Sequence, residues 1–387
     1  MQASPDLIDN ARSVTSSVAP SPLDVGSLAR AKAAYTTRFV DALRVSRGSE
    51  GFSLLAGDGI VPRSGDVVLA AVGEIGQHQR LELTTGRRSE LFPGDKILLA
   101  YGPRYAPDQF EAEVPPDLQP ADLVAAGGLI GRMLSSHDWM QDPTQVIPHG
   151  LLADAEGVVT LGRCAPLQPS TSPPARWQAV RPSVIAALGT SMNSGKSTTV
   201  ASIVRGLTAA GYRVATGKVT GTGAGGDAYM FEDAGATRVL DFTDFGFSST
   251  YLLDSATVTA LFTSLVDELA GDEPDVIVVE IADGLLQPET SNLIVDPWFH
   301  EIVDTVVFSA GDAMGAMTGL AELRRRSLDV VAVAGLLTAS PLAVRETERV
   351  VDVPVVPLID LCTPEIAEQI LAPAIRPREL QAVGAAG

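Results

Sequence analysis

Hydrophobic and polar positions follow one pattern after residue 182 and another before it. In the later part, nearly continuous apolar runs rich in β-branched residues lie at 183–189, 213–219, 275–281, 304–311, 328–338 and 353–359. Segments with apolar residues at helical spacing lie between them, at 196–211, 256–270 and 316–327. Buried parallel strands and the helices that cover them produce this pattern, so we predict a mainly parallel sheet with helices on both faces.

The earlier part of the chain has shorter apolar runs. Residues 27–46 carry apolar residues at helical spacing and predict one helix. Between 50 and 114, short apolar or alternating runs are separated by turn sequences such as RSG, TTGRR and FPGD. This pattern predicts a small all-β unit. Further on, the stretch VAAGGLIGRML (124–134) predicts a helix that packs closely through its glycines.

These patterns divide the chain into four regions. Residues 1–48 form a tail and helix, and residues 49–165 form the β-rich N-terminal domain with its connector. Residues 166–181 are rich in Pro and Ser, which predicts an interdomain linker. The α/β domain occupies 182–387, and two domains suit a chain of 387 residues.

Composition and charge narrow the class of protein. Hydrophobic residues make up 45% and charged residues 19%, as in a soluble globular enzyme. A net charge of -19 argues against a nucleic-acid or anionic-membrane partner, because both need a basic surface. No run of about 18 apolar residues and no signal-peptide pattern is present. The two cysteines lie far apart, which fits a reducing compartment, so we expect a cytoplasmic protein.

The stretch LGTSMNSGKSTTV (188–200) indicates a phosphate-binding loop, or P-loop. It follows the first predicted strand of the parallel sheet and opens its first helix, where backbone N–H groups can cradle a phosphate. We expect Lys196 to neutralise the β- and γ-phosphates, Ser197 to ligate Mg²⁺, and Thr198 to support the loop. The predicted nucleotide-binding residues are Thr190, Ser191, Met192, Asn193, Ser194, Gly195, Lys196, Ser197 and Thr198. The fold class is therefore α/β, with a C-terminal P-loop NTPase-type sheet and a small β-rich N-terminal domain.

Charged residues also lie at the ends of two other predicted strands. Lys218 lies at the carboxyl end of the second strand (213–219), and Glu280 lies at the carboxyl end of the strand at 275–281. The carboxyl ends of parallel strands meet at one edge of a sheet, so both residues are expected near the P-loop. Lysine is rare here, with four in the chain, which favours a specific need for Lys196 and Lys218. The candidate catalytic residues are Lys196, Lys218 and Glu280, the candidate metal ligands are Ser197, Glu280 and Asp227, and Asp241 is a further candidate for metal or substrate contact.

The loop resembles that of dethiobiotin synthetase, G-T-D-x-x-x-G-K-T. In both, a Gly-Thr pair begins six residues before the Gly-Lys pair, although Ser191 stands where that family has Asp. Lys218 is a partial match to the lysine of the family's K-P-V element, which meets substrate and phosphate. Glu280 matches the glutamate of V-V-E-G-A-G-G, shared with cobyrinate synthetase, but Ile281 and Asp283 replace its glycines.

This resemblance implies an ATP- and Mg²⁺-dependent enzyme for small molecules. Enzymes of this kind activate a carboxylate, or a carbamate formed from CO₂, by phosphoryl transfer, and an amine then forms a C–N bond. The substrate would be an amino or carboxylic acid. Related synthetases often place the substrate at a subunit interface, so the resemblance also implies a homodimer or higher homo-oligomer.

A second resemblance is to the P-loop family that includes bacterial D-glutamate N-acetyltransferase. That family has T-G-Q-T-G, a D-F element and V-V-E-G-Q-G-S-L-x-H-P, and this chain has TGTGAGG, LDFTDFG and VVVEIADGLLQPETSNLIV. Ile281 replaces the first glycine and Gln287 the histidine. This resemblance implies an N-acyltransferase that holds the phosphates of acetyl-CoA at the P-loop. Both resemblances cover roughly residues 183–340.

A third alternative is an NTP-driven switch or accessory protein, with the Gly-rich segment 221–226 as the switch. A guanine-specific protein would carry N-K-x-D after a late strand, where this chain has AGLLTASPL (334–342), so ATP is favoured.

Two segments of the β-rich domain also carry polar residues. They are GEIGQHQRLEL, which holds His78, and YGPRYAPDQFEAE, which mixes Tyr, Arg and acids. Either could line a substrate site, but a surface loop is the favoured interpretation of both.

Overall fold

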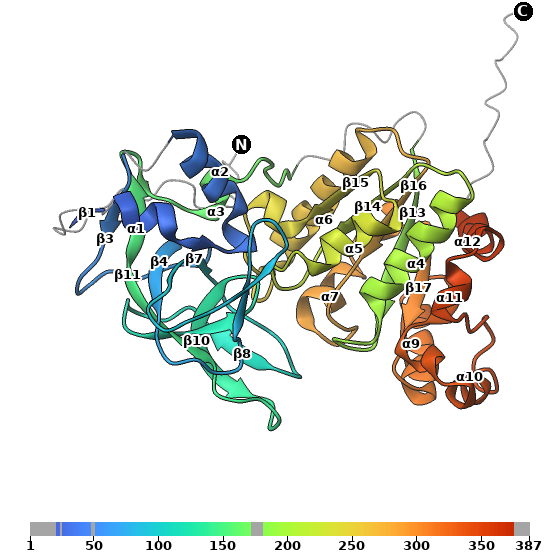
Figure 1. Ribbon diagram of the computed structural model, residues 1–387. Helices are drawn as coiled ribbons and strands as arrows, with labels where there is room; N and C mark the ends of the chain where they lie inside the picture. Colours follow the sequence, from blue (N-terminus) through green and yellow to red (C-terminus); the bar gives the residue numbers. More distant parts are fainter. Residues whose placement is uncertain (1–20, 24, 48–50, 172–180, 375–387) are drawn as a thin grey trace, which may run out of the picture.

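The computed structural model describes residues 21–23, 25–47, 51–171 and 181–374. Within these ranges the N-terminal half builds a ten-stranded mixed sheet and the C-terminal half a six-stranded parallel sheet. Figure 1 shows the β-rich unit on the left and the parallel sheet with its helices on the right. The protein is therefore an α/β protein with a β-rich N-terminal unit, as the sequence predicts. No helix in the described ranges is long and apolar enough to cross a membrane.

The parallel sheet has β13 at its centre. Its strand order is β15 (Arg238–Asp241), β14 (Val214–Lys218), β16 (Val276–Glu280), β13 (Ser183–Gly189), β17 (Thr305–Ser309) and β18 (Val330–Ala334). Alternate residues of β13 enter different cores: Val184 packs on one face of the sheet and Ile185 on the other. Both faces are thus buried, which explains why these strands are continuously apolar.

Helices cover both faces of this sheet. One face packs against α4 (Lys196–Ala209), α5 (Gly226–Ala234), α11 (Leu358–Leu361) and α12 (Pro364–Leu371). The other packs against α6 (Ser255–Ala270), α7 (Pro288–Leu293), α8 (Pro297–Ile302) and α9 (Ala313–Arg325), and α10 (Pro341–Thr347) lies against α9. The predicted strand at 353–359 is wrong, because only Val355 pairs with the sheet, through an isolated bridge to Val333. The prolines at 354 and 357 have no N–H to extend that pairing.

The β-rich unit is built around its own core. The main path of its sheet runs β1 (Ser21–Pro22), β3 (Ser53–Leu55), β11 (Thr144–Asp154), β4 (Val67–Val72), β7 (Lys96–Tyr101), β10 (Leu129–Ser136) and β8 (Phe110–Glu113). Three more strands pair beside it: β2 (Lys32–Ala33), β9 (Ala121–Ala125) and β12 (Gly157–Val158). A separate pair is formed by β5 (Arg80–Glu82) and β6 (Arg88–Glu90).

Two predicted helices in this unit are wrong. The segment 27–46 forms α1 (Val25–Arg30), β2, a short 3₁₀ helix and α2 (Arg38–Arg47), because Lys32 and Ala33 pair with β7. The segment 124–134 forms the end of β9, a turn at 126–128 and the greater part of β10. Gly128 in this turn has φ +100, and a Cβ there would lie 2.0 Å from the Cβ of Ala34. Tertiary strand pairing outweighs helix propensity in both segments. The predicted linker at 166–181 lies largely outside the described residues.

A buried polar network joins the two units. Tyr35 donates a hydrogen bond to Asp241 (2.9 Å), and Arg38 donates one to Asp244 (2.9 Å). Asp241 is 4% exposed and its carboxylate accepts from Thr243, at the start of a 3₁₀ helix. Asp241, a sequence candidate for metal or substrate contact, therefore lies at the junction of the units. Its side chain stabilises the way they dock.

Candidate functional site

The loop between β13 and α4 has the backbone of a tight strand-to-helix turn. Gly195 has φ +96 and Asn193 has φ +60, both in the left-handed region. A Cβ on Gly195 would lie 2.9 Å from the Cα of Gly335, so only glycine fits. The loop is further held by Leu336, whose N–H donates to the carbonyl of Ser194 (2.8 Å). The shape of the phosphate loop is therefore fixed by its neighbour after β18.

Lys196 occupies the position expected of the phosphate-binding lysine. Its Nζ donates to the carbonyl oxygen of Ser191 (2.8 Å), so it folds back over the loop that it closes. The residue is 4% exposed, and burial lowers its pKa, although Glu280 opposes this effect. A phosphate oxygen in the loop would replace the carbonyl as acceptor and give the buried ammonium a charged partner.

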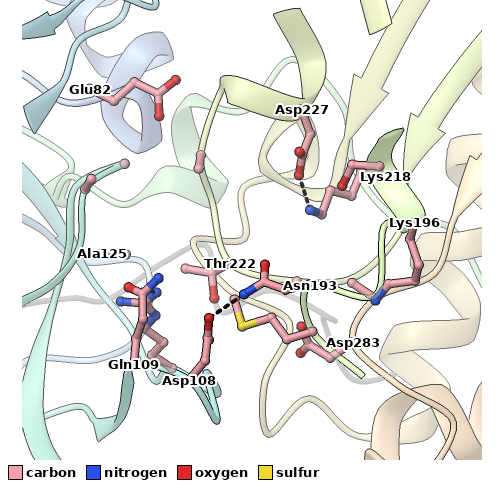
Figure 2. A pocket seen from close by; sticks show the side chains of 18 of the residues that line it. Glu82, Asp108, Gln109, Ala125, Asn193, Lys196, Lys218, Thr222, Asp227 and Asp283 are labelled. Atoms are coloured by element: carbon pink, nitrogen blue, oxygen red, sulfur yellow. Dashed lines mark hydrogen bonds and ion pairs between the residues drawn. The ribbon is translucent and has the colours of Figure 1, made fainter. Parts of the chain in front are cut away.

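Lys218, Glu280 and Asp227 meet beside the loop. Lys218 on β14 is the register partner of Glu280 on β16, and its Nζ lies 3.7 Å from Glu280 Oε1. The same Nζ is hydrogen bonded to Asp227 on α5, as the dashed line in Figure 2 marks. Ser197 donates to Glu280 Oε1 (3.1 Å), which connects this cluster to the first turn of α4. The structure thus brings together Lys196, Ser197, Lys218, Asp227 and Glu280, whereas the side chain of Asp241 bonds Tyr35 at the junction of the units.

Burial and neighbouring charges shift the pKa values of Lys218, Asp227 and Glu280 in different directions. Burial opposes the charge on Lys218, but the carboxylates of Asp227 and Glu280 outweigh it and raise the pKa of the lysine. Burial also opposes ionisation of Asp227, yet Lys218 holds the pKa of that carboxyl below its usual value. Burial raises the pKa of Glu280, and the positive charge of Lys218 opposes this rise without cancelling it. A further cation beside Glu280 would therefore stabilise its ionised form.

The oxygen atoms present fit Mg²⁺. Glu280 Oε2 is buried without a hydrogen-bond partner among the described residues, while Oε1 accepts from the hydroxyl of Ser197, and the charge of the Asp227 carboxylate acts on the same group. Hard oxygen donors of this kind suit Mg²⁺, which takes few protein ligands and completes its shell with phosphate and water. The described residues contain no group of three or more His, Cys, Asp or Glu that could hold a metal ion.

The cluster forms one wall of a cavity of about 910 Å³. The opposite wall comes from the β-rich unit, and Figure 2 shows Asp108 and Gln109 facing Lys196 and Lys218 across it. Both N-terminal segments interpreted as surface loops contribute to this wall, so that interpretation is wrong. They face the cavity because the polar junction between the units holds them against the parallel sheet.

The P-loop residues divide into two groups around the cavity. Its wall includes Met192, Asn193, Gly195, Lys196, Ser197 and Thr198. The remaining three are not part of this wall. Ser191 accepts from Lys196, Thr190 lies close to Gly315 of α9, and the buried hydroxyl of Ser194 has no hydrogen-bond partner in the described part of the chain.

The two walls are tied together at the P-loop. Asn193 donates a hydrogen bond to Asp108, marked by a dashed line in Figure 2. On the same segment Arg104 donates to Gln109 (2.8 Å), and burial lowers its pKa to about 10. Burial, followed by the charge of Arg104, lowers the pKa of His78 to about 4. Sequence patterns do not single out Arg104, because nothing near it repeats a known motif.

No protein-family model and no curated protein matches this chain. Among solved structures, signal recognition particle receptor FtsY from Elizabethkingia anophelis in complex with GDP is 16% identical, with a TM-score of 0.34, over 52% of this chain and 67% of that one. FtsY from Mycoplasma mycoides is 14% identical, with a TM-score of 0.33, over 51% and 69%. Chloroplast FtsY from Physcomitrella patens is 15% identical, with a TM-score of 0.33, over 54% and 69%.

The strand order and the loop show a P-loop NTPase-like fold. A fold by itself does not define a reaction. What the protein does must therefore be argued from the residues of the cavity.

Proposed function

We propose that this protein binds ATP with Mg²⁺ at the 190–198 loop and transfers the γ-phosphoryl group to a small acid in the cavity. The acid, a carboxylate or carbamate, is thereby activated for attack by an amine and C–N bond formation. The observation that carries this proposal is the gathering of Lys196, Ser197, Lys218, Asp227 and Glu280 on one wall of a single cavity. At about 910 Å³, that cavity is near the upper end of the usual range for ligand sites, roughly 300–1,000 Å³.

Each residue has a role in this reaction. Lys196 exchanges the Ser191 carbonyl for phosphate oxygens, and Ser197 with Glu280 holds Mg²⁺, which neutralises the charge that develops on the phosphates. Lys218 stabilises the transferring phosphoryl group. An oxygen of the acid forms a bond to the γ-phosphorus while the bond to the β-phosphate oxygen breaks and ADP leaves. The amine then attacks the acyl carbon, loses a proton and displaces phosphate.

The decisive experiment follows ADP and free CoA in parallel. Purified protein is incubated with ATP, Mg²⁺, acetyl-CoA and pools of small carboxylic and amino acids. ADP released only when an acid is added supports the proposal, and GTP in place of ATP tests the choice of base. CoA released without ADP overturns it in favour of N-acyl transfer. Hydrolysis that needs no acid but responds to a partner protein overturns it in favour of a switch.

Two lysine variants give the matched control. Lys196→Ala should abolish binding of ATP, because it removes the only lysine that reaches over the loop among the described residues. Lys96→Ala should leave binding unchanged, since Lys96 lies on β7 against His149 (2.6 Å), outside the cavity wall. Normal ATP binding by Lys196→Ala would refute the assignment of the loop.

A further inference from the structure

Arg104 is a buried cation that the fold leaves incompletely paired. It is 4% exposed, and one guanidinium nitrogen, Nη2, donates to Gln109. The other two nitrogens, Nε and Nη1, are buried without a hydrogen-bond partner in the described part of the chain. A buried charged donor without a partner costs free energy, so such a group calls for a reason beyond stability.

The surroundings of Arg104 do not neutralise it. Asp108 and Asp283 act on its charge, but the side-chain hydrogen bond that Arg104 forms within the described residues goes to Gln109. Asp108 bonds Asn193 of the P-loop through Oδ2, and its Oδ1 has no hydrogen-bond partner in the described part of the chain. His78, on the same wall, remains neutral at pH 7, since burial lowers its pKa to about 4. The charge of Arg104 is therefore available to an anion that enters the cavity.

Arg104 and the phosphate-handling residues line the same cavity from opposite sides. Arg104 comes from the segment before β8 in the β-rich unit, whereas Lys196 and Lys218 come from the parallel-sheet unit. Asp283 is influenced by cations of both walls. Burial raises the pKa of its carboxyl group, and the charges of Lys196 and Arg104 both oppose that rise. A ligand that spans the cavity can thus meet the P-loop lysines at one end and Arg104 at the other.

We propose that Arg104 binds a carboxylate of the acid substrate that stays ionised while a second carboxylate of the same molecule is phosphorylated. The substrate is then a dicarboxylate or an acidic amino acid, and this assignment rests on the proposed function for the reacting end. Guanidinium N–H groups with no protein partner are well suited to a carboxylate, and such charge-assisted bonds are among the strongest in proteins.

The test measures acid binding and nucleotide binding separately. Wild-type protein, Arg104→Met and Arg132→Met are titrated calorimetrically with succinate and glutarate, with the uncharged diamide succinamide as a reference, and separately with MgATP. Wild type should bind at least one diacid and not the diamide. Arg104→Met should weaken binding of that diacid roughly tenfold to a hundredfold and leave the affinity for MgATP unchanged. Arg132→Met should change neither, since Arg132 forms an exposed pair with Glu113 on the β-rich sheet.

A stability measurement separates binding from folding. Arg104→Met should keep or raise the unfolding temperature, because it removes a buried charge that lacks partners. If this variant does not fold, Arg104→Gln carries the same comparison. If neither folds, Arg104 serves the fold and the proposal is wrong.

The remaining outcomes distinguish this proposal from the proposed function. The proposal for Arg104 is overturned if wild-type protein binds MgATP but no diacid. It is also overturned if Arg104→Met binds the diacid with normal affinity, or if this variant loses affinity for MgATP as strongly as for the diacid. The last result would make Arg104 a phosphate contact. If wild type binds a diacid through Arg104 but never MgATP, the acid subsite stands and the proposed phosphoryl transfer falls.

Discussion

The buried carboxyl group of Glu280 determines which kind of ligand suits this part of the site. Glu280 is 2% exposed and bonds Ser197 through one oxygen, while its other oxygen has no partner among the described residues. Burial raises its pKa even with Lys218 nearby. A carboxyl group in this state is stabilised by a cation beside its free oxygen. Binding of Mg²⁺ here would therefore depend on the negative charge of Glu280 more than on the shape of its side chain.

The first prediction concerns that charge. Glu280→Gln should raise the Mg²⁺ concentration needed for half-maximal ATP binding by about tenfold or more, since it removes one ionic ligand. The fold should survive, because the amide can still accept from Ser197 and a buried charge has been removed. Magnesium titrations of ATP binding measure the effect, with Glu113→Gln on the distant β-rich sheet as control. Equal magnesium dependence in wild type and Glu280→Gln would remove Glu280 from the metal site.

His78 should make stability depend on acid pH. Its pKa is about 4 in the folded protein because of burial and Arg104, against about 6.5 when unfolded. Above pH 6.5 both states are neutral and the residue has no effect. As pH falls from 6.5 to 4, the unfolded state binds the proton first, so the free energy of unfolding drops by up to about 3 kcal/mol. Urea unfolding at pH 7.5, 5.5 and 4.5 should show a smaller drop for His78→Gln. Parallel curves for both proteins would argue against the depressed pKa.

At the level of elements, sequence predicted the parallel sheet better than the β-rich unit. Continuous apolar strands and amphipathic helices leave a strong local pattern, and so β13, α4, β14 and β16 were placed correctly together with Lys196, Lys218 and Glu280. Strands of two or three residues such as β2 leave no such pattern, and their alanines resemble a helix. The place of Arg104 in the cavity wall was not predicted for a related reason: the cavity depends on the opposite wall, which no local pattern encodes.

The phosphate loop offers a prediction about an element. Gly195→Ala should lower the unfolding free energy by at least about 2 kcal/mol, for two reasons. The new Cβ would clash with the backbone at Gly335, and an alanine is strained at the left-handed φ of this position. Gly211→Ala is the matched control, since Gly211 has φ +94 but nothing lies within 4 Å of its Cβ. It should cost only the strain, about 1 kcal/mol, and leave ATP binding intact. Denaturant unfolding and ATP titration of both variants test this. Similar losses in the two would mean that the contact with Gly335 does not hold the loop.

For the molecule as a whole, function depends on how the two units meet. Tyr35 and Arg38 of the β-rich unit bond Asp241, the last residue of β15, and Asp244, and this docking brings the second wall of the cavity to the P-loop. The D-F element that resembles an acyltransferase motif thus acts here as part of a junction. Neither unit alone forms the cavity, because its wall takes residues from both.

The hydrogen bond between Asn193 and Asp108 should make the two walls respond together. ATP binding must rearrange the loop around Lys196, and the ordered loop should then hold the 102–109 segment more firmly through Asp108. Hydrogen exchange of the amides at 102–109 should therefore slow when wild type is saturated with MgATP. Asp108→Ala should still bind MgATP but lose this protection, while amides of β3, outside the cavity wall, should not change in either protein. Equal protection with and without Asp108 would mean that the walls are coupled through the Tyr35–Asp241 junction instead. Unchanged exchange in wild type would mean that nucleotide binding at one wall is not sensed by the other.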